Sequence, residues 1–590
     1  MGVLIVVCPR PGHPAIVAER LRSAALRLAP PEMPLREPLL LETAGVVAAV
    51  ANPTDEGVWL HDNEDPPGGD TPGGGGAAVG GLFGDNGSWW HAKSAAPEGT
   101  YALARWDAHV VELVADICGS RTIWYALTQD VFLASTSQRA LVMLLGSFEL
   151  LPEATACFLS SGTLGPTVSW DARIRRVPPD ARAVLDRGSW RVTVHETVPE
   201  FGSATGDNEV EVGHLREAIA TTCGDLNLDL ERWVLPLSGG HDSRTLLAFL
   251  VQNGSRPRCV TWTTRASLRN PLSDASIARV LARRYHVEHE LLYLDASRDG
   301  LETTLQRFVA ANEGRNDEIA GYLDGFALWR DLALAGVQGI IRGDEPFGLH
   351  RRRMGVDDGR RHVGGATPDD YPEGHPLHSL ELARPSWPAR LQKSPQEQLS
   401  DYCHRLSQQG FLPTVLAGLA GPKALYLETV NPLASRLIVR TARLLPPKLR
   451  DHARAYQRIV DGLNPFVPYA RFASTLPVPD LLVQPDLLEL CVRELVSPAM
   501  QRILAGDGPL HVLTAMSSAT GERRDVRTFL KALTREASDA LPTRLAVELA
   551  PPWRGPESLP AAKLAFRALL ASRTVSLLEE DAWALAGPAQ

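Results

Sequence analysis

The sequence predicts an α/β protein in two parts, one built on antiparallel strands and one on a doubly wound parallel sheet. Residues 99–196 contain short β-type runs that are separated by turn residues. Residues 233–341 instead alternate strands and helices at the spacing of a parallel sheet. We place the boundary in the polar, glycine-containing stretch Gly202–Glu209, which gives domains 1–205 and 206–590.

The composition is that of a globular protein, with 44% hydrophobic and 22% charged residues. A net charge of −9 argues against a nucleic-acid surface. No apolar run reaches membrane-spanning length, and Leu4–Val7 is too short for the core of a signal peptide. The 7 cysteines form no C-x-x-C pair and are expected to be reduced thiols. We therefore expect a cytoplasmic protein that binds neither nucleic acid nor membrane.

The N-terminal part is expected to begin with a strand at Gly2–Cys8 and a helix at Ala15–Leu28. The stretch His61–Gly81 is rich in Gly, Pro and Asp, which predicts a flexible loop. Two short helices are expected at Gln138–Leu145 and Ala154–Ser161. Further strands are expected at Tyr101–Trp106, Val110–Ala115, Thr122–Leu127 and Val131–Ser135, and as a pair within Arg182–Glu196.

The C-terminal part is expected to hold the parallel sheet, a mobile charged loop at His350–His375, and a helical bundle packed on the sheet from about Pro385. Its strands are expected at Trp233–Leu237, Arg258–Thr264, Glu288–Leu294 and Val337–Ile341. Its helices are expected at Val212–Cys223, Ser243–Gln252, Ser273–Tyr285, Leu301–Ala311 and Ala320–Ala335.

The stretch around Ser238-Gly239-Gly240 has the features of a phosphate-binding loop. The glycines lack a Cβ, so the backbone can approach a ligand closely. The helix that follows begins with free N–H groups and partial positive charge, which favours anions. Asp242 would repel phosphate there unless Mg²⁺ bridges the two. The sequence therefore predicts a nucleotide site with a metal ion, against the alternative of an ordinary strand–turn–helix.

The motif Ser-Gly-Gly-x-Asp-Ser at 238–243 resembles the pyrophosphate loop of the ATP pyrophosphatases. These enzymes split ATP between the α and β phosphates and adenylate a carboxylate. The resemblance implies an adenine nucleotide α hydrolase-like fold for the C-terminal part. The ATP contacts that it implies are Pro236, Ser238, Gly239, Gly240, Asp242, Ser243, Trp262, Gly339 and Asp344.

A second motif, Arg342-Gly-Asp-Glu-Pro-Phe-Gly348, follows an apolar strand, so Asp344 is expected at a strand's carboxyl end, where ligands bind in such sheets. The motif resembles the Gly-x-Asp-Glu-x-Phe-Gly stretch of the asparagine synthetase family. In that family this aspartate binds Mg²⁺ together with the aspartate of the pyrophosphate loop. The resemblance implies Asp242 and Asp344 as Mg²⁺ ligands.

The runs 99–107, 116–125 and 132–141 resemble the glutamine-hydrolysing domain of asparagine synthetase, a class II glutamine amidotransferase domain of the Ntn type with αββα layers. The nucleophile of that domain is a cysteine that follows the initiator methionine. Here that position is Gly2, and Cys8 lies inside a predicted strand without a free α-amine to act as its base. We expect a degenerate domain without glutaminase activity.

Two later segments resemble parts of the same family. Leu425–Leu433 matches a segment whose glutamate lies near the acyl acceptor, which implies that Glu428 positions or deprotonates the attacking amine; a helix-surface carboxylate is the alternative. Arg454–Arg458 matches a Lys-x-x-x-Arg segment, which implies a phosphate-contacting role for Arg454, in place of the lysine, and a catalytic role for Arg458. Asp317 either caps a helix or contacts substrate.

The resemblance extends over nearly the whole chain. The runs 158–166, 169–171 and 177–182 look most like lasso peptide macrolactam cyclases. This implies a ligase that uses ATP and Mg²⁺ to adenylate an Asp or Glu side chain of a precursor core peptide, which the peptide's own N-terminal amine then attacks. A leader peptidase and a leader-recognition protein are the implied partners. The alternatives are a β-lactam synthetase-like ligase, an asparagine synthetase-like enzyme and a non-catalytic ATP-binding protein.

Overall fold

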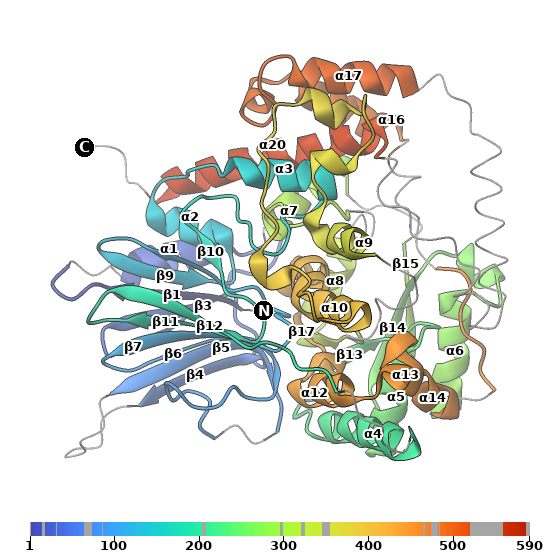
Figure 1. The fold of residues 1–590 in the computed structure, drawn as a ribbon. Coiled ribbons are helices and arrows are strands. Elements are labelled where there is room, and N and C mark those ends of the chain that lie inside the picture. The colour runs from blue at the N-terminus through green and yellow to red at the C-terminus, as the bar shows by residue number, and fades with distance from the viewer. Residues whose placement is uncertain are drawn as a thin grey trace.

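The fold is that of a computed structural model (Figure 1). It describes residues 2–13, 18–30, 32–63, 73–84, 87–202, 208–294, 299–319, 325–344, 355–463, 466–473, 482, 484–519 and 559–585. Within these ranges, no helix is long and apolar enough to cross a bilayer. All seven cysteines are buried free thiols, as expected from their spacing.

Two antiparallel sheets of six strands each form the described N-terminal half (Figure 1). The first has the order β10 (Arg175–Arg176), β8 (Trp124–Leu127), β9 (Val131–Ser135), β1 (Val3–Pro9), β3 (Val46–Ala51) and β2 (Leu39–Thr43). The second has the order β12 (Arg191–Glu196), β11 (Ala181–Asp186), β7 (Val110–Ala115), β6 (Gly99–Trp106), β5 (Gly74–Leu82) and β4 (Val58–Asn63). The predicted strands are confirmed, and β2, β3, β4, β5 and β10 are additional to them.

Strand β1 shows how these layers pack. Val6 and Cys8 belong to the apolar cluster between the two sheets, whereas Ile5 and Val7 belong to the cluster beneath the helices. Because both faces are buried, the strand is a continuous apolar run rather than an alternating one. The helices over this sheet are α1 (Ala18–Arg27), α2 (Gln138–Leu145), α3 (Pro152–Ser161) and α20 (Ala561–Ala584).

The C-terminal half is built around a five-stranded parallel sheet. Its order is β15 (His289–Tyr293), β14 (Arg258–Thr263), β13 (Trp233–Pro236), β16 (Gly339–Ile341) and β17 (Glu428–Val430). Each neighbouring pair is parallel, so all carboxyl ends meet at one edge. The order reverses direction beside β13, and in such sheets ligands bind at that point.

Helices cover both faces of the parallel sheet, which confirms the predicted doubly wound arrangement. One face packs against α4 (Asn208–Gly224), α5 (Asp242–Gln252), α6 (Asp274–Tyr285), α12 (Arg436–Leu444) and α14 (Arg454–Leu463). The other face packs against α7 (Leu301–Asn312) and α8 (Gly325–Leu334). The remaining helices of four or more residues are α9 (Val356–Arg360), η4 (Arg361–Gly365), η6 (Pro376–Ser379), α10 (Leu399–Leu406), η8 (Ser407–Leu416), α11 (Ala417–Ala420), α13 (Pro447–Arg450), α16 (Pro485–Leu495), η12 (Pro498–Arg502) and α17 (Gly508–Ala519).

The prediction of a flexible loop at His61–Gly81 is wrong for the residues that the structure describes. Gly74–Leu82 is β5, a buried strand between β4 and β6. Its glycines allow close packing: a Cβ on Gly76 would lie 2.7 Å from the Cβ of Trp90, and one on Gly75 would lie 3.0 Å from the ring of Trp106. Glycine-rich composition here reflects tight contacts with large aromatic side chains rather than disorder.

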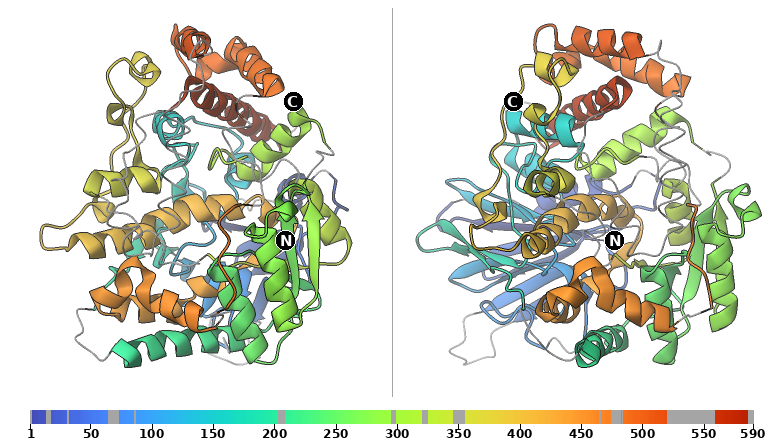
Figure 2. Two further views of the ribbon diagram at one scale, coloured as in Figure 1. Left: turned by 90° about the vertical axis from the view of Figure 1, so that its right-hand side faces the viewer. Right: turned by 45° about the vertical axis from the view of Figure 1, so that its right-hand side comes forward.

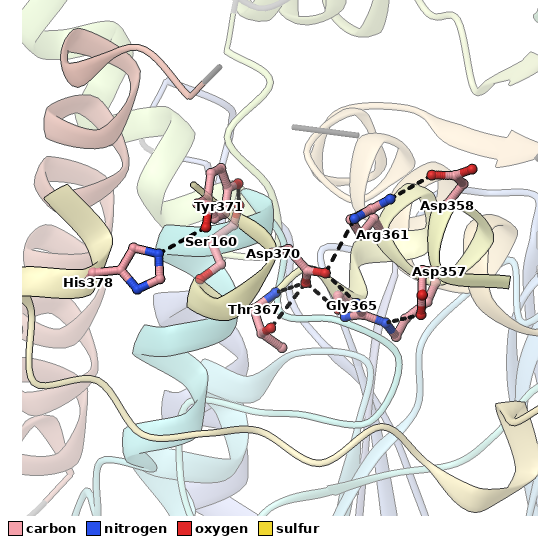
Figure 3. Close-up of polar contacts among 10 residues, drawn as sticks. Ser160, Asp357, Asp358, Arg361, Gly365, Thr367, Asp370, Tyr371 and His378 are labelled. Carbon is pink, nitrogen blue, oxygen red and sulfur yellow. Dashed lines mark hydrogen bonds and ion pairs between the residues drawn. The ribbon is translucent and has the colours of Figure 1, made fainter. Parts of the chain in front are cut away.

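The prediction of a mobile loop at His350–His375 is also wrong over its described part, 355–375. Short helices fill this segment, and the Asp370 carboxylate holds them together by accepting bonds from Arg360 (2.9 Å) and from the Thr367 N–H (2.7 Å) (Figure 3). The Tyr371 hydroxyl donates to the Ser160 carbonyl of α3. The segment is therefore anchored to the N-terminal half. Residues 350–354 lie outside the described residues.

The C-terminal helices divide between the two halves, instead of all packing on the parallel sheet as predicted. Helices α12 and α14 cover that sheet. Helices α16, α17 and α20 share an apolar cluster with α2 and α3, and Figures 1 and 2 show α20 beside α3. The last described helix thus completes the core of the first half. The domain division at residue 205 stays a prediction.

Candidate active site

The glycine loop lies at the carboxyl edge of β13, directly before α5. Two serines fold it: the Ser238 N–H donates to the Ser243 hydroxyl (3.0 Å), and the Gly240 N–H donates to the Ser238 hydroxyl (3.2 Å). The Leu237 N–H donates to the Val260 carbonyl (2.8 Å), so pairing with β14 continues up to the loop. The loop therefore has a fixed position on the central strand of the sheet.

Its two glycines have different roles. A Cβ on Gly239 would lie 2.4 Å from the Cβ of Ala470 and 3.0 Å from that of Ile277, so this glycine lets two segments pack against the loop. Among the described residues, a Cβ on Gly240 would meet only the Ser238 hydroxyl of the same loop, at 3.3 Å. Space for a ligand is therefore above Gly240, next to the amino end of α5.

The structure brings Asp242 and Asp344 together through Gly343. A Cβ on Gly343 would lie 2.9 Å from the Cβ of Asp242 and 3.0 Å from its carbonyl carbon. Asp344, the next residue, is therefore beside the first turn of α5, at the carboxyl edge of the sheet. Asn431, which follows β17, fixes this backbone: its amide accepts from the Asp344 N–H (3.1 Å) and donates to the Asp344 carbonyl (2.8 Å).

Two basic side chains interact with Asp344. Arg342 Nη2 lies 2.8 Å from Asp344 Oδ1. Lys423 donates to the Leu419 carbonyl (3.1 Å). Burial lowers the pKa of Lys423 well below its ordinary value, Arg342 lowers it further, and Asp344 opposes the change. Arg342 and Lys423 therefore both interact electrostatically with the Asp344 carboxylate.

Tyr456 is a site residue that the sequence prediction missed. Its buried hydroxyl donates to Asp242 Oδ1 (3.0 Å) and lies 3.1 Å from the Thr245 hydroxyl. The signal was present in the chain: Tyr456 lies on the buried face of α14 with Ile459 and Val460. A tyrosine hydroxyl on an otherwise apolar face needs a polar partner.

The segment 466–473 lies against the glycine loop. The Ala470 N–H donates to the Gly239 carbonyl (3.1 Å), and Tyr469 stacks on His241 with ring centroids 4.2 Å apart. Arg244, buried in α5, donates to the Val467 carbonyl (2.7 Å) and so anchors the segment. Arg471 is exposed beside these contacts.

The structure does not bring Arg454 and Arg458 to this site. Both lie on the face of α14 opposite Tyr456. The Arg458 guanidinium is exposed and pairs with Glu209 of α4 at 3.5 Å. Arg454 donates to the Lys448 carbonyl (3.0 Å) at the surface. Because residues four apart share a helix face and the residue between them faces away, both arginines point away from Asp242.

Glu428 is a buried strand residue, not the helix-surface carboxylate considered as an alternative. It begins β17 opposite Gly339 and therefore lies at the amino edge of the sheet, remote from Asp344. It pairs with Arg121, which comes from the loop after β7, and burial lowers the pKa of Arg121 to about 10. A Cβ on Gly57 would lie 2.4 Å from Glu428 Cγ. This ion pair joins the two halves.

The remaining predicted ATP contacts separate into two groups. Pro236 ends β13 beneath the loop, and Trp262 is in the carboxyl half of β14, with a buried ring N–H that has no partner among the described residues. Both are near the loop. Gly339 is at the amino end of β16, where a Cβ would lie 2.3 Å from the Trp233 ring, so packing accounts for this glycine.

Asp317 has a structural role in the part of the chain described. It is buried and pairs with Arg567 (2.6 Å) and Lys563 (3.1 Å) of α20. Neither helix capping nor substrate contact is needed to account for it. The pair instead ties the C-terminal helix to the loop after α7.

Gly2 is buried in a place that leaves no room for a side chain. A Cβ there would lie 2.4 Å from Val50 Cγ1 and 2.8 Å from Val79 Cγ1. A cysteine would require these neighbours to move. Cys8 is fully buried in β1, and burial raises the pKa of its thiol, with Arg187 opposing. Neither position provides a nucleophile.

The site can accommodate a nucleotide with a divalent cation. Asp242 lies beside Gly343, the residue before Asp344, next to a glycine loop and a helix amino end. Carboxylates are hard oxygen ligands that suit Mg²⁺ when phosphates and water supply the rest. Among the described residues, no group of three or more His, Cys, Asp or Glu side chains could hold a metal. A cation here would therefore depend on its ligand's oxygens.

Comparisons with known proteins add two solved structures. No family model and no curated protein matches the chain. The structure of the allosteric regulatory enzyme of purine biosynthesis matches at 10% identity, covering 49% of this chain and 80% of that one, with a TM-score of 0.22. The glutamine phosphoribosylpyrophosphate amidotransferase from B. subtilis, complexed with ADP and GMP, matches at 7% identity with a TM-score of 0.22. The match covers 50% of this chain and 91% of that one. TM-scores this low do not establish a shared fold.

Proposed function

We propose that the chain is an ATP-dependent, AMP-forming amide ligase and, within that class, a lasso peptide macrolactam cyclase. The observation that carries the proposal is the packing of Gly343, the residue before Asp344, on Asp242 beside the glycine loop. Two carboxylates at a phosphate-binding loop are unfavourable unless a cation joins them to a polyphosphate.

In this proposal the phosphates lie over Gly240 and the amino end of α5, with Asp242 and Asp344 as ligands of Mg²⁺. The metal ion, when bound, would offset the charge of the phosphates. Tyr456 holds Asp242 in place by its hydrogen bond. We assign the phosphate-contacting cation to Arg471 in place of Arg454, because Arg471 is exposed beside the loop and its guanidinium has no hydrogen bond or ion pair with the described residues.

The choice of a cyclase within the ligases rests on the sequence resemblance. A precursor core peptide is the proposed substrate, with an Asp or Glu side chain adenylated and the peptide's N-terminal amine as attacker. The lack of space at Gly2 supports an amine that does not come from glutamine. Ring closure then depends on holding both ends of the peptide, which is a matter of positioning. A leader peptidase and a leader-recognition protein remain proposed partners.

The direct test incubates the full chain with ATP, Mg²⁺ and leaderless core peptides that carry one Asp or Glu. The expected result is AMP, pyrophosphate and a peptide lighter by one water. The same peptides acetylated at the N-terminus should give no ring, since the attacking amine is blocked. AMP formed only with a small β-amino acid would favour the β-lactam synthetase alternative, and ATP binding without AMP would contradict ligase activity.

Tyr456→Phe tests whether Tyr456 orients Asp242. A hydrogen bond to a charged group contributes about 1.5–3 kcal/mol, or roughly 10- to 100-fold in an equilibrium. We expect the Mg²⁺ concentration for half-maximal AMP formation to rise by about tenfold or more. Tyr371→Phe is the matched control, because it loses a buried hydroxyl that donates to the Ser160 carbonyl away from the site. An equal Mg²⁺ dependence of AMP formation in both variants would contradict the assignment of Tyr456 as the residue that orients Asp242.

A further inference from the structure

We propose that a cavity beside Asp344, on the side away from the glycine loop, binds a carboxylate group through Arg342 and Arg121. The cavity has a volume of about 30 Å³. Ser120 and Arg121 of the N-terminal half line it together with Arg342, Asp344 and Asn431. This rests on the proposed function in one respect, that the bound group is a carboxylate of the peptide substrate, held apart from the one that becomes adenylated.

Its size restricts the occupant. A volume of about 30 Å³ has room for roughly two water molecules, which is the scale of a carboxylate. A neighbouring cavity of about 60 Å³ shares Ser120, Arg121, Ala417, Ala420 and Thr429 with the first. Neither is lined by a described residue of the glycine loop. A polyphosphate does not fit, and the cavity is separate from the proposed phosphate position.

Arg342 supplies the strongest reason for an anion. One of its terminal nitrogens pairs with Asp344 at 2.8 Å. The other, Nη1, is buried and has no hydrogen-bond partner among the described residues. A buried donor without an acceptor is unfavourable, and a carboxylate can accept from a guanidinium at two parallel positions. If Asp344 binds a cation, Arg342 loses its present partner and both terminal nitrogens become available.

Arg121 makes the second wall positive. Its side chain is 9% exposed, it pairs with the fully buried Glu428, and it lines both cavities. The pKa of about 10 keeps it charged at neutral pH.

The proposal gives the N-terminal half a function that needs no nucleophile. Arg121 and Ser120 belong to the loop between β7 and β8, whereas Arg342 and Asp344 follow β16. The cavity exists only where the two halves meet, so the carboxylate site would be incomplete without the N-terminal half. That half would act as one wall of the substrate site.

The test uses acetate as the smallest carboxylate and acetamide as its neutral counterpart. Binding of ¹³C-labelled acetate to the full chain is measured by NMR line broadening, without ATP. Acetate is expected to bind and acetamide is not. Arg342→Gln should weaken acetate binding at least tenfold, and Ala420→Leu should do the same by filling the cavity without changing charge. Equal binding of acetate and acetamide, or unchanged acetate binding in both variants, would overturn the proposal.

Two further variants complete the design. The double variant Arg121→Gln, Glu428→Gln removes both charges of the buried pair together, so neither is left alone, and it should weaken acetate binding if Arg121 is part of the site. Unchanged binding would remove Arg121 from it. Ala389→Leu, at an exposed position, is the control for Ala420→Leu and should bind acetate as the wild type does.

The outcomes separate this site from the proposed function. ATP binding and AMP formation are measured on the same wild-type preparation. Acetate binding that depends on Arg342, in a chain that never forms AMP, would support the cavity and contradict the ligase. AMP formation by the wild type, together with acetate binding that Arg342→Gln leaves unchanged, would support the ligase and contradict the cavity.

Discussion

Replacing Asp242 with asparagine is expected to reduce AMP formation by more than about 100-fold at saturating Mg²⁺. Asparagine keeps the shape of the side chain and its contact with Tyr456 but loses the negative charge that a hard cation requires. Even residues that only support metal ligands change activity by about 10- to 100-fold when they are mutated, so loss of a ligand should exceed that range. AMP and pyrophosphate are measured with a core peptide as substrate.

The matched control is Asp486→Asn. Asp486 is also an acidic residue in the first turn of a helix, α16, but it is exposed. Asp486→Asn removes one negative charge from the first turn of a helix, as Asp242→Asn does, but at a position away from the site. AMP formation should therefore stay within about twofold of wild type. Wild-type activity in Asp242→Asn would contradict the assignment of both aspartates, because Asp344 alone cannot join a cation to the loop.

The second large effect is on stability, and it concerns Asp581 of α20. This carboxylate is fully buried and accepts from Arg139 Nε (2.6 Å), Arg139 Nη2 (3.1 Å) and Arg27 Nε (3.2 Å). Asp581→Asn keeps the volume but removes the counter-charge to which the buried Arg139 guanidinium is hydrogen-bonded. Breaking a buried pair in this way costs about 3–5 kcal/mol. We expect that loss in the free energy of unfolding, measured by urea denaturation.

Glu580→Gln is the control for Asp581→Asn, since Glu580 is the exposed neighbour on the same helix. Its free energy of unfolding should change by less than about 0.5 kcal/mol. Equal effects of the two substitutions would mean that the buried network of Asp581 does not hold α20 in place.

The parallel sheet could be predicted because its signals are local. Four of its strands, β13 to β16, are short apolar runs that the sequence predicts, whereas β17 is additional to the prediction. The loop at Ser238–Ser243 and the turn at Asp344 both follow such strands, so their meeting at one edge follows from the topology. Tyr456 escaped prediction because its contact with Asp242 depends on how α14 packs on α5.

The errors arose where long-range contacts decide the structure. The glycine-rich composition at 74–76 predicts a loop, but these residues form a strand because Trp90 and Trp106 pack closely over them. Glu428 resembles a reactive carboxylate, but its setting depends on Arg121, which is far away in the sequence. The segment 355–375 is highly charged, and its order comes from pairing of those charges with one another. No local pattern specifies such partners.

The position of α20 has a consequence for how the chain is made. The apolar cluster beneath the first sheet contains Leu21 of α1 and Leu569 of α20, so the first half shares its core with residues that leave the ribosome much later. At about 5–20 residues per second, synthesis of the intervening chain takes roughly half a minute to two minutes. During that time the helices over the first sheet lack their covering layer. The newly made N-terminal half should therefore be a client of chaperones until α20 has been made, and a chain truncated before residue 559 should remain one.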